Sequence, residues 1–242
     1  PISNSNQSLR NFESSYVFPT NLSPSLRQNN NDVGNKGLNF NLDYEKPFFD
    51  KRDRLEVGLA VSIRQNQNDL LVENYDYKTS IFNKNEKLSS DFIYNEKIYA
   101  AYASYNYRKN GWTVKGAVRT EYTNVDFDLN TAQNYVVDPY FSAFPSMSIS
   151  KNIKKKYNVG FSYGVRINRP RENTLNPQVN NADTANISYG NPNLSPSYTH
   201  QLALNMGMYG NNWSFNPRIT YSRATGVIER YRFIHPNGVS ES

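Results

Sequence analysis

The fold is decided by the stretch YNVGFSYGVRIN, which is Tyr157–Asn168. Every odd position in it is apolar or aromatic, whereas every even position is polar, charged or glycine. The apolar set is Tyr157, Val159, Phe161, Tyr163, Val165 and Ile167. Side chains alternate between the two faces of a β-strand, so this period of two predicts a strand with one apolar face and one polar face.

The same alternation recurs on both sides of this stretch and predicts an all-β protein without helices. It is clear over 38–45, 55–64, 112–123, 198–208 and 213–223, and weaker over 96–107 and 140–150. With 157–168 these ranges make about eight strands. Pro217 falls inside the last of them. Because proline has no N–H to donate, a bulge or a local sheet edge is expected there.

Composition narrows the class of protein further. The 242 residues carry a formal charge of +6, include no cysteine, and are 37% hydrophobic but 14% aromatic. The longest apolar run, Ile98–Ala103, is far too short for a transmembrane helix, which needs about 20 residues. The lack of cysteine excludes a disulfide scaffold, a cysteine-based zinc site and thiol catalysis.

The connections between the expected strands alternate in length. Four are short, at 46–54, 108–111, 151–156 and 210–212, and the three between them are long, at 65–95, 124–138 and 169–196. Transmembrane β-barrels follow this rule, with tight periplasmic turns and long extracellular loops. The expected strands also suit a tilted strand that crosses a bilayer.

A soluble β-sandwich or a lipocalin-like barrel would also bury one face of each strand. Two features favour the membrane. Aromatic residues gather near the strand ends, where interfacial girdles belong. The polar faces carry charge in mid-strand, as a water-filled or plugged lumen would, at Lys115, Arg119, Glu121, Arg166 and Arg218. The prediction is an antiparallel up-and-down transmembrane β-barrel. With the short turns in the periplasm, both chain ends lie outside the cell, so a part of a larger barrel is expected.

Several motifs, in this order, resemble those of the TonB-dependent receptors, an outer-membrane β-barrel family. They are LDYEKPF (42–48) with LEVG (55–58), YAAY (99–102), GAVRTE (116–121), FPS (144–146) with YGVRINRP (163–170), and NP (176–177) with GNPNLSP (190–196). The resemblance covers about 38–223.

The resemblance implies a barrel of about 22 strands in the bacterial outer membrane, of which this chain, as one partial barrel domain over 1–242, supplies about eight. It implies import of a nutrient (a siderophore, a glycan or a peptide) powered by TonB. The alternative is a barrel that does not transport and serves as a structural or interaction component of an outer-membrane complex. The implied partners are outer-membrane lipid, a plug domain, the TonB complex through an N-terminal part, and a surface lipoprotein or other envelope proteins.

The sequence predicts no enzyme, cofactor or metal site. His200 and His235 are too few and too far apart for a ligand cluster. The run from Asp126 to Asn130 begins like a calcium loop, but Thr131 replaces the expected glycine, so a solvated loop is expected. Basic residues gather in the short turns, where lipid headgroups or water explain them, and no nucleic-acid partner is expected.

The candidate contacts for the lumen, the plug or the cargo are polar-face and long-loop residues: Arg119, Glu121, Arg166, Asn168 and Tyr189. Arg119, Glu121 and Arg166 could equally form an ion-pair ladder inside the wall. Glu121 is the last residue of the GAVRTE motif. For a glutamate in this position the resemblance implies contact with an arginine of the plug, with Arg119 as the local partner.

Overall fold

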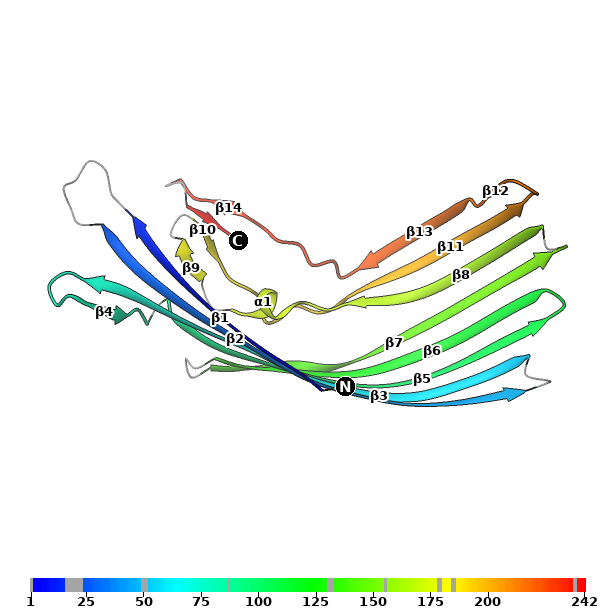
Figure 1. The fold of residues 1–242 in the computed structure, drawn as a ribbon, viewed down its shortest axis with the longest axis horizontal. Helices are drawn as coiled ribbons and strands as arrows, with labels where there is room; N and C mark the ends of the chain where they lie inside the picture. The colour runs from blue at the N-terminus through cyan, green and yellow to red at the C-terminus, as the bar shows by residue number, and fades with distance from the viewer. Residues whose placement is uncertain are drawn as a thin grey trace.

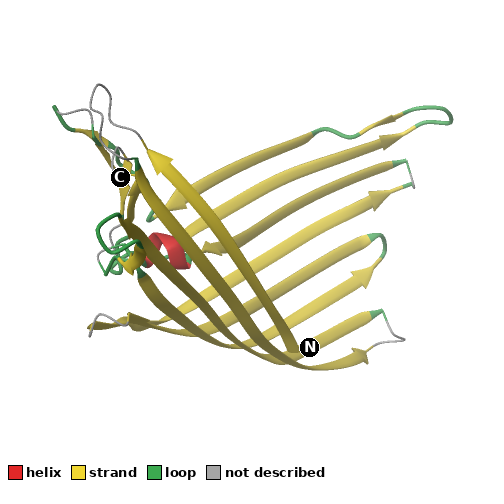
Figure 2. Ribbon diagram, turned by 60° about the vertical axis from the view of Figure 1, so that its left-hand side comes forward, coloured by secondary structure: helices red, strands yellow, loops and turns green. Residues whose placement is uncertain are grey.

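The computed structural model describes the chain apart from residues 1, 16–23, 49–51, 87, 130–132, 155, 178–179, 184–185 and 237–238. Most of it is one curved antiparallel sheet (Figures 1 and 2). Along the sheet the strands are β1 (Ile2–Ser15), β2 (Ser25–Phe48), β3 (Asp53–Asp76), β5 (Ser90–Lys109), β6 (Trp112–Leu129), β7 (Gln133–Ile153), β8 (Tyr157–Asn168), β11 (Ser197–Tyr209) and β12 (Ser214–Phe215). Two more strands join this sheet: β4 (Ile81–Lys84) pairs with β3, and β13 (Arg218–Thr225) pairs with β11.

The order of the strands follows the chain, and neighbouring strands are antiparallel, as the up-and-down barrel prediction requires. In the described part of the chain the sheet is open, with β1 at one edge and β12 and β13 at the other. The all-β, antiparallel prediction is therefore confirmed, and the sheet is a section of a barrel wall rather than a closed barrel.

Several strands, among them β2, β3, β5 and β7, are much longer than the alternation predicts, whereas β8 has the predicted bounds. The expected strand 55–64 is part of β3, which has 24 residues, and β5 begins at Ser90 instead of 96. Most of the expected long connections 65–95 and 124–138 is therefore strand. The first expected strand, 38–45, is the second half of β2, and the first half of β2 forms a hairpin with β1. A strand needs only about 9–11 residues to cross a bilayer. The halves of β2 and β3 that lie farther from the short turns, here called the upper halves, thus extend beyond the bilayer.

The short turns have the local chemistry that tight hairpins need. Asn110 and Gly111, between β5 and β6, both have positive φ, at 50° and 77°. A two-residue turn of this kind matches the twist of the strands, and Asn-Gly adopts it at low cost. At the same end of the sheet, Lys151 Nζ donates to the Asn110 carbonyl at 2.8 Å and lies 4.7 Å from the centre of the Trp112 ring.

The two faces of the sheet differ as the alternation predicts. Large apolar side chains stand exposed on the convex face, including Phe141 (66% exposed) and Ile219 (69% exposed). About ten residues of each strand above the short turns, tilted, span roughly 25 Å, the height of an outer-membrane apolar band. The concave face holds the buried carboxylates Glu96 and Glu121. None of the described helices is long and apolar enough to cross a membrane.

Pro217 interrupts the last expected strand without shifting its register. The pairs Met208–Phe215 and Asn205–Arg218 keep the same alignment on either side of it. Met206 N–H still donates to the Pro217 carbonyl, at 3.0 Å. The N–H that the proline lacks would face β11, as its carbonyl does, so Pro217 breaks the ladder between β12 and β13 and does not mark the open edge of the described sheet. The register shows no bulge there.

The connection 169–196 folds onto the concave face and carries the elements that depart most from the prediction (Figure 2). It contains one helical turn, α1 (Glu172–Leu175), where no helix was expected, and β9 (Asn180–Asp183) and β10 (Asn186–Ser188). With β14 (Phe233–Ile234) and β15 (Ser240–Glu241) these two strands form a second, four-stranded sheet.

An apolar cluster joins this inward-folded connection to the wall. Leu175 of α1 is 3% exposed and packs with side chains from the upper halves of β5 and β6. The cluster consists of Phe92, Tyr94, Val125, Phe127, Leu129 and Leu175, with Val137 and Leu194 partly buried against it. Phe127 and Leu129 belong to the run expected to be a solvated loop. That expectation is wrong for 126–129, which is strand, while Asn130 lies outside the described residues.

Candidate functional site

Glu121 lies at the centre of an ion cluster on the concave face of β6. Its side chain is only 9% exposed. Arg119, two residues earlier on the same face, donates from Nε to Glu121 Oε1 at 2.6 Å. Arg169, the first residue after β8, donates from Nη2 to Glu121 Oε2 and, at 3.4 Å, to Thr123 Oγ1. Both carboxylate oxygens of Glu121 are thus bound by arginines of this chain.

Arg169 fastens the inward-folded connection to the wall at the point where that connection begins. A buried carboxylate is costly unless it is paired and hydrogen-bonded, and Arg169 supplies this pairing from a position 48 residues further along the chain. Sequence reasoning missed Arg169, because it lies just after the end of a strand. There the alternation of apolar and polar residues no longer indicates the face on which a side chain lies. Arg119 is the local partner that the sequence suggested, and a contact of Glu121 with a plug arginine stays a prediction.

The rest of the concave face is a network of similar pairs. Arg64 of β3 binds Glu96 of β5 at 3.1 Å, and the Tyr94 hydroxyl donates to Glu96 Oε1 at 3.1 Å. Nearer the short turns, the Ser104 hydroxyl donates to Glu56 Oε2 at 2.9 Å. Glu56 and Glu96 are thus each bound by a residue of a neighbouring strand.

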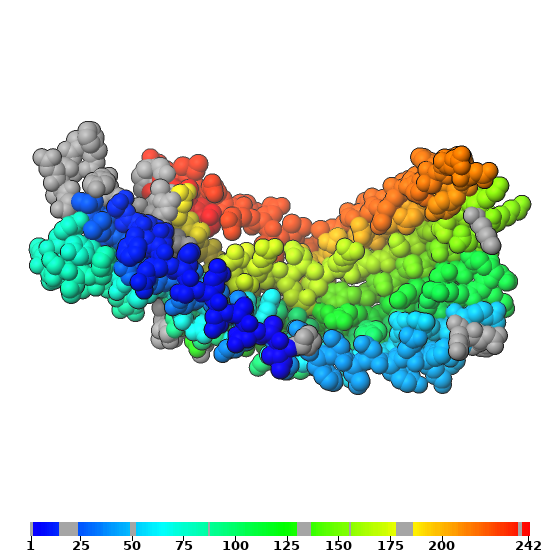
Figure 3. Space-filling model, viewed as in Figure 1, coloured from blue at the N-terminus to red at the C-terminus, as the bar shows by residue number. Residues whose placement is uncertain are grey.

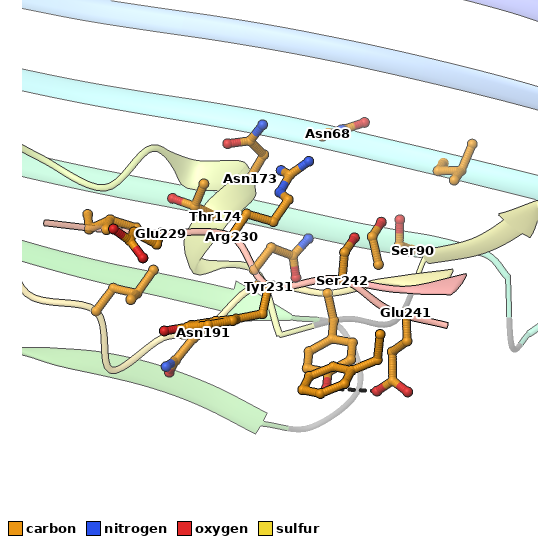
Figure 4. Close-up of a pocket in the computed structure, with 18 of the residues that line it drawn as sticks. Asn68, Ser90, Asn173, Thr174, Asn191, Glu229, Arg230, Tyr231, Glu241 and Ser242 are labelled. Atoms are coloured by element: carbon orange, nitrogen blue, oxygen red, sulfur yellow. Dashed lines mark hydrogen bonds between the residues drawn. The ribbon is translucent and has the colours of Figure 1, made fainter. Parts of the chain in front are cut away.

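A cavity of about 890 Å³ lies farther from the short turns than this network. It is enclosed by the wall on one side and, on the other, by the inward-folded connection 169–196 and the C-terminal segment that follows β13, together called the inward-folded segments. Wall residues such as Asn68 and Ser90 face residues of α1 and of the C-terminal segment across it (Figure 4). The C-terminal segment packs beside the connection 169–196, where Tyr189 N–H donates to the Ser242 carbonyl at 3.1 Å (Figure 3). The cavity is thus assembled from regions of the chain that are far apart in sequence.

Tyr189 is the one predicted site residue that lines this cavity. Its hydroxyl donates to Glu241 Oε1 at 2.9 Å, and His235 Nε2 lies 2.7 Å from Glu241 Oε2. Hydrogen bonds from His235 and then Tyr189 lower the pKa of Glu241 below its ordinary value. The hydrogen bond to Glu241 raises the pKa of Tyr189.

The remaining candidates lie apart from both groups. Arg166 and Asn168 are exposed on β8, opposite Thr199 and Ser197 of β11. Neither is among the described residues that line the cavity. Asn176, Gly190, Asn191 and Leu194 line the cavity and lie in the NP and GNPNLSP motifs. The lining residues of β2, β3, β5, α1 and the segment after β13 were missed by sequence reasoning, because no motif connects them. Within the described ranges, no group of three or more histidine, aspartate or glutamate side chains could hold a metal ion.

The sequence profile of the "Outer membrane protein beta-barrel family" matches residues 2–241 of this chain. A comparison with curated protein sequences finds no match.

Solved structures with the same fold include a transporter and two receptors. The copper transporter OprC is 9% identical, with a TM-score of 0.61 over 99% of this chain and 38% of its own. The hemophore receptor HasR of Serratia marcescens, in complex with its hemophore HasA and heme, is 9% identical, with a TM-score of 0.56 over 92% of this chain and 39% of its own. The ferric preacinetobactin receptor BauA of Acinetobacter baumannii is 11% identical, with a TM-score of 0.52 over 99% of this chain and 36% of its own. This chain therefore spans less than two fifths of each of them.

Proposed function

The chain belongs to the outer membrane β-barrel family, and we propose that it forms part of the wall of an outer-membrane receptor that imports a nutrient with energy delivered by TonB. The likeness to OprC, HasR and BauA supports this at the level of the fold. The nutrient classes that the sequence suggests are a siderophore, a glycan or a peptide. The protein is placed in the bacterial outer membrane by its family.

The observation that carries the proposal is the cavity of about 890 Å³ at the end of the sheet away from the short turns. Such a cavity has the size of a small-molecule site, roughly 300–1,000 Å³. With the short turns in the periplasm, it faces the cell exterior, where a nutrient arrives. Tyr189 lines it and is our candidate cargo contact, whereas Glu121 holds the inward-folded connection on the wall through Arg169 and is bound on β6 by Arg119.

The chain has no cysteine, so a cysteine introduced into it is a single labelling site within it. The test uses the parent protein, meaning the complete receptor of which we propose this chain forms part, with any cysteine outside the chain changed to serine. Asn191, in the cavity wall, is changed to cysteine and labelled with a bulky maleimide; Thr79, in the exposed turn between β3 and β4, is the matched control. Labelling at 191 is expected to abolish TonB-dependent accumulation of the nutrient, and labelling at 79 to leave it unchanged. The proposal fails if deletion of the parent gene alters the accumulation of no siderophore, glycan or peptide. Loss of an envelope complex in that deletion would favour the alternative, non-transporting role.

A further inference from the structure

The cavity is lined mainly by neutral groups that form hydrogen bonds. Besides the tyrosines, nine of the lining side chains are amides or hydroxyls: Asn31, Asn68, Ser90, Asn173, Thr174, Asn176, Ser188, Asn191 and Ser242. An asparagine amide offers both donors and an acceptor at one position, and a hydroxyl offers a donor and acceptors. A ligand hydroxyl has the same dual character. The lining is therefore complementary to a ligand that carries many hydroxyl groups.

The cavity carries little unbalanced charge. Glu229 and Arg230 are adjacent in sequence and opposite in sign. Glu241 is bound by His235 and Tyr189, so its charge is engaged within the protein. The described lining residues comprise two carboxylates and one guanidinium, so an anionic ligand would meet a small excess of like charge. Because the carboxylate in excess, Glu241, is already hydrogen-bonded within the protein, the lining favours a neutral ligand.

Aromatic rings stand exposed on the side formed by the inward-folded segments. Tyr189 is 51% exposed, Tyr231 71% and Phe233 66%. Aromatic rings supply large apolar faces, and the tyrosines add a polar tip. The amides of Asn68, Asn173 and Asn191 lie around the same space (Figure 4). A ligand between them is offered apolar stacking on one side and hydrogen bonds on the other.

One acceptor in the lining has no partner among the described residues. Asn31 Oδ1, on the wall strand β2, is buried and accepts no hydrogen bond from them. A buried acceptor without a partner is costly, and rotation of the Asn31 side chain toward the cavity would let a ligand hydroxyl donate to it and remove this cost.

We propose that this cavity binds a short, neutral oligosaccharide, held by the amides around Asn31 and Asn191 and by stacking on Tyr189 and Tyr231. Sugars combine many hydroxyls with apolar C–H faces, which is the combination that the lining offers. The proposal rests on the proposed function and specifies its cargo. The volume of about 890 Å³ is in the upper part of the range for small-molecule sites, roughly 300–1,000 Å³, and so leaves room for more than one sugar ring.

The test is calorimetric titration of the detergent-purified parent protein. The probes are neutral tetrasaccharides of glucose, mannose, xylose and N-acetylglucosamine, with tetra-alanine and ferric citrate representing the other nutrient classes. At least one tetrasaccharide is expected to bind. Asn191→Ala and Tyr231→Ala are each expected to weaken binding about tenfold. The matched control Tyr221→Ala, exposed on the convex face, is expected to leave binding unchanged. The heat-induced mobility shift on gels verifies that each variant folds.

Each result decides something different. If no tetrasaccharide binds, or if one binds equally well to Asn191→Ala and Tyr231→Ala, the oligosaccharide proposal is overturned. If tetra-alanine or ferric citrate binds instead, and these variants weaken it, the ligand class is wrong while the nutrient-receptor function stands. That function is tested separately, by whether accumulation in cells depends on TonB.

Discussion

Tyr102 and Asp43 form a hydrogen bond across an intervening strand, with the Tyr102 hydroxyl 2.6 Å from Asp43 Oδ1. Asp43 lies on β2 and Tyr102 on β5, and the register places Gly58 of β3 directly between them. A Cβ built on Gly58 would lie 2.5 Å from Tyr102 Cε1 and 2.6 Å from Asp43 Oδ1. The absence of a side chain at Gly58 therefore lets the tyrosine lie flat across the strand.

Gly58→Ala in the parent protein is expected to lower the free energy of unfolding by about 1–3 kcal/mol, because the added methyl group overpacks this site. Unfolding in urea, followed by tryptophan fluorescence in detergent, measures the change. Gly116→Ala is the control, since a Cβ there would meet nothing within 4 Å. Equal effects of the two substitutions would contradict the role of Gly58.

Glu121→Gln is expected to loosen the connection 169–196 from the wall. It leaves Arg119 and Arg169 without their counter-ion, at a cost of about 2–3 kcal/mol, below that of a fully buried pair because Arg119 is partly exposed. Limited proteolysis of the connection measures the loosening. Glu45→Gln, which removes the exposed pair with Arg54, should change proteolysis little, since such pairs contribute about 0–1 kcal/mol. Unchanged cleavage in Glu121→Gln would show that the cluster does not hold the connection.

Sidedness can be measured with single cysteines in a chain that has none. On intact cells, a membrane-impermeant maleimide is expected to label Thr79→Cys, in the turn between β3 and β4, and not Lys109→Cys, beside the turn between β5 and β6. The long strands extend beyond the apolar band only at the end of the sheet that carries the turn between β3 and β4. The reverse pattern of labelling would invert the topology, and lysed cells, in which both sites should react, provide the control.

Acid is expected to loosen the C-terminal side of the cavity. Because the folded pKa of Glu241 is below its ordinary value of 4.5, its ionised form stabilises this contact above that value, and the stabilisation is lost as pH falls through the folded pKa. A dye on Pro236→Cys should therefore show lower fluorescence anisotropy at acid pH than at neutral pH. In Glu241→Gln the anisotropy should be low throughout. An acid-induced fall that persists in this variant would assign the effect to another group.

The transmembrane part of this fold could be predicted because its signal is local. Over Tyr157–Asn168 one face meets lipid and the other does not, so the sequence itself alternates, and β8 spans that same range. The wall cluster was predictable in part for the same reason. Arg119 and Glu121 are two residues apart on one strand and so share a face, whereas Arg169 reaches Glu121 only after two further strands have been laid down.

By itself, then, the sequence determined the antiparallel wall, the face of it that meets lipid, and the end that carries the tight turns. These depend on a period of two and on residues adjacent in the chain. Three features became visible only in the folded structure: the full length of the strands, the inward fold of 169–196, and the cavity that Asn31, Asn191 and Tyr231 share. Beyond the bilayer the two faces of the sheet no longer differ in whether they meet lipid. The residues of the strands therefore do not alternate between apolar and polar there. The cavity joins segments far apart in sequence, which meet only when the sheet curves around them.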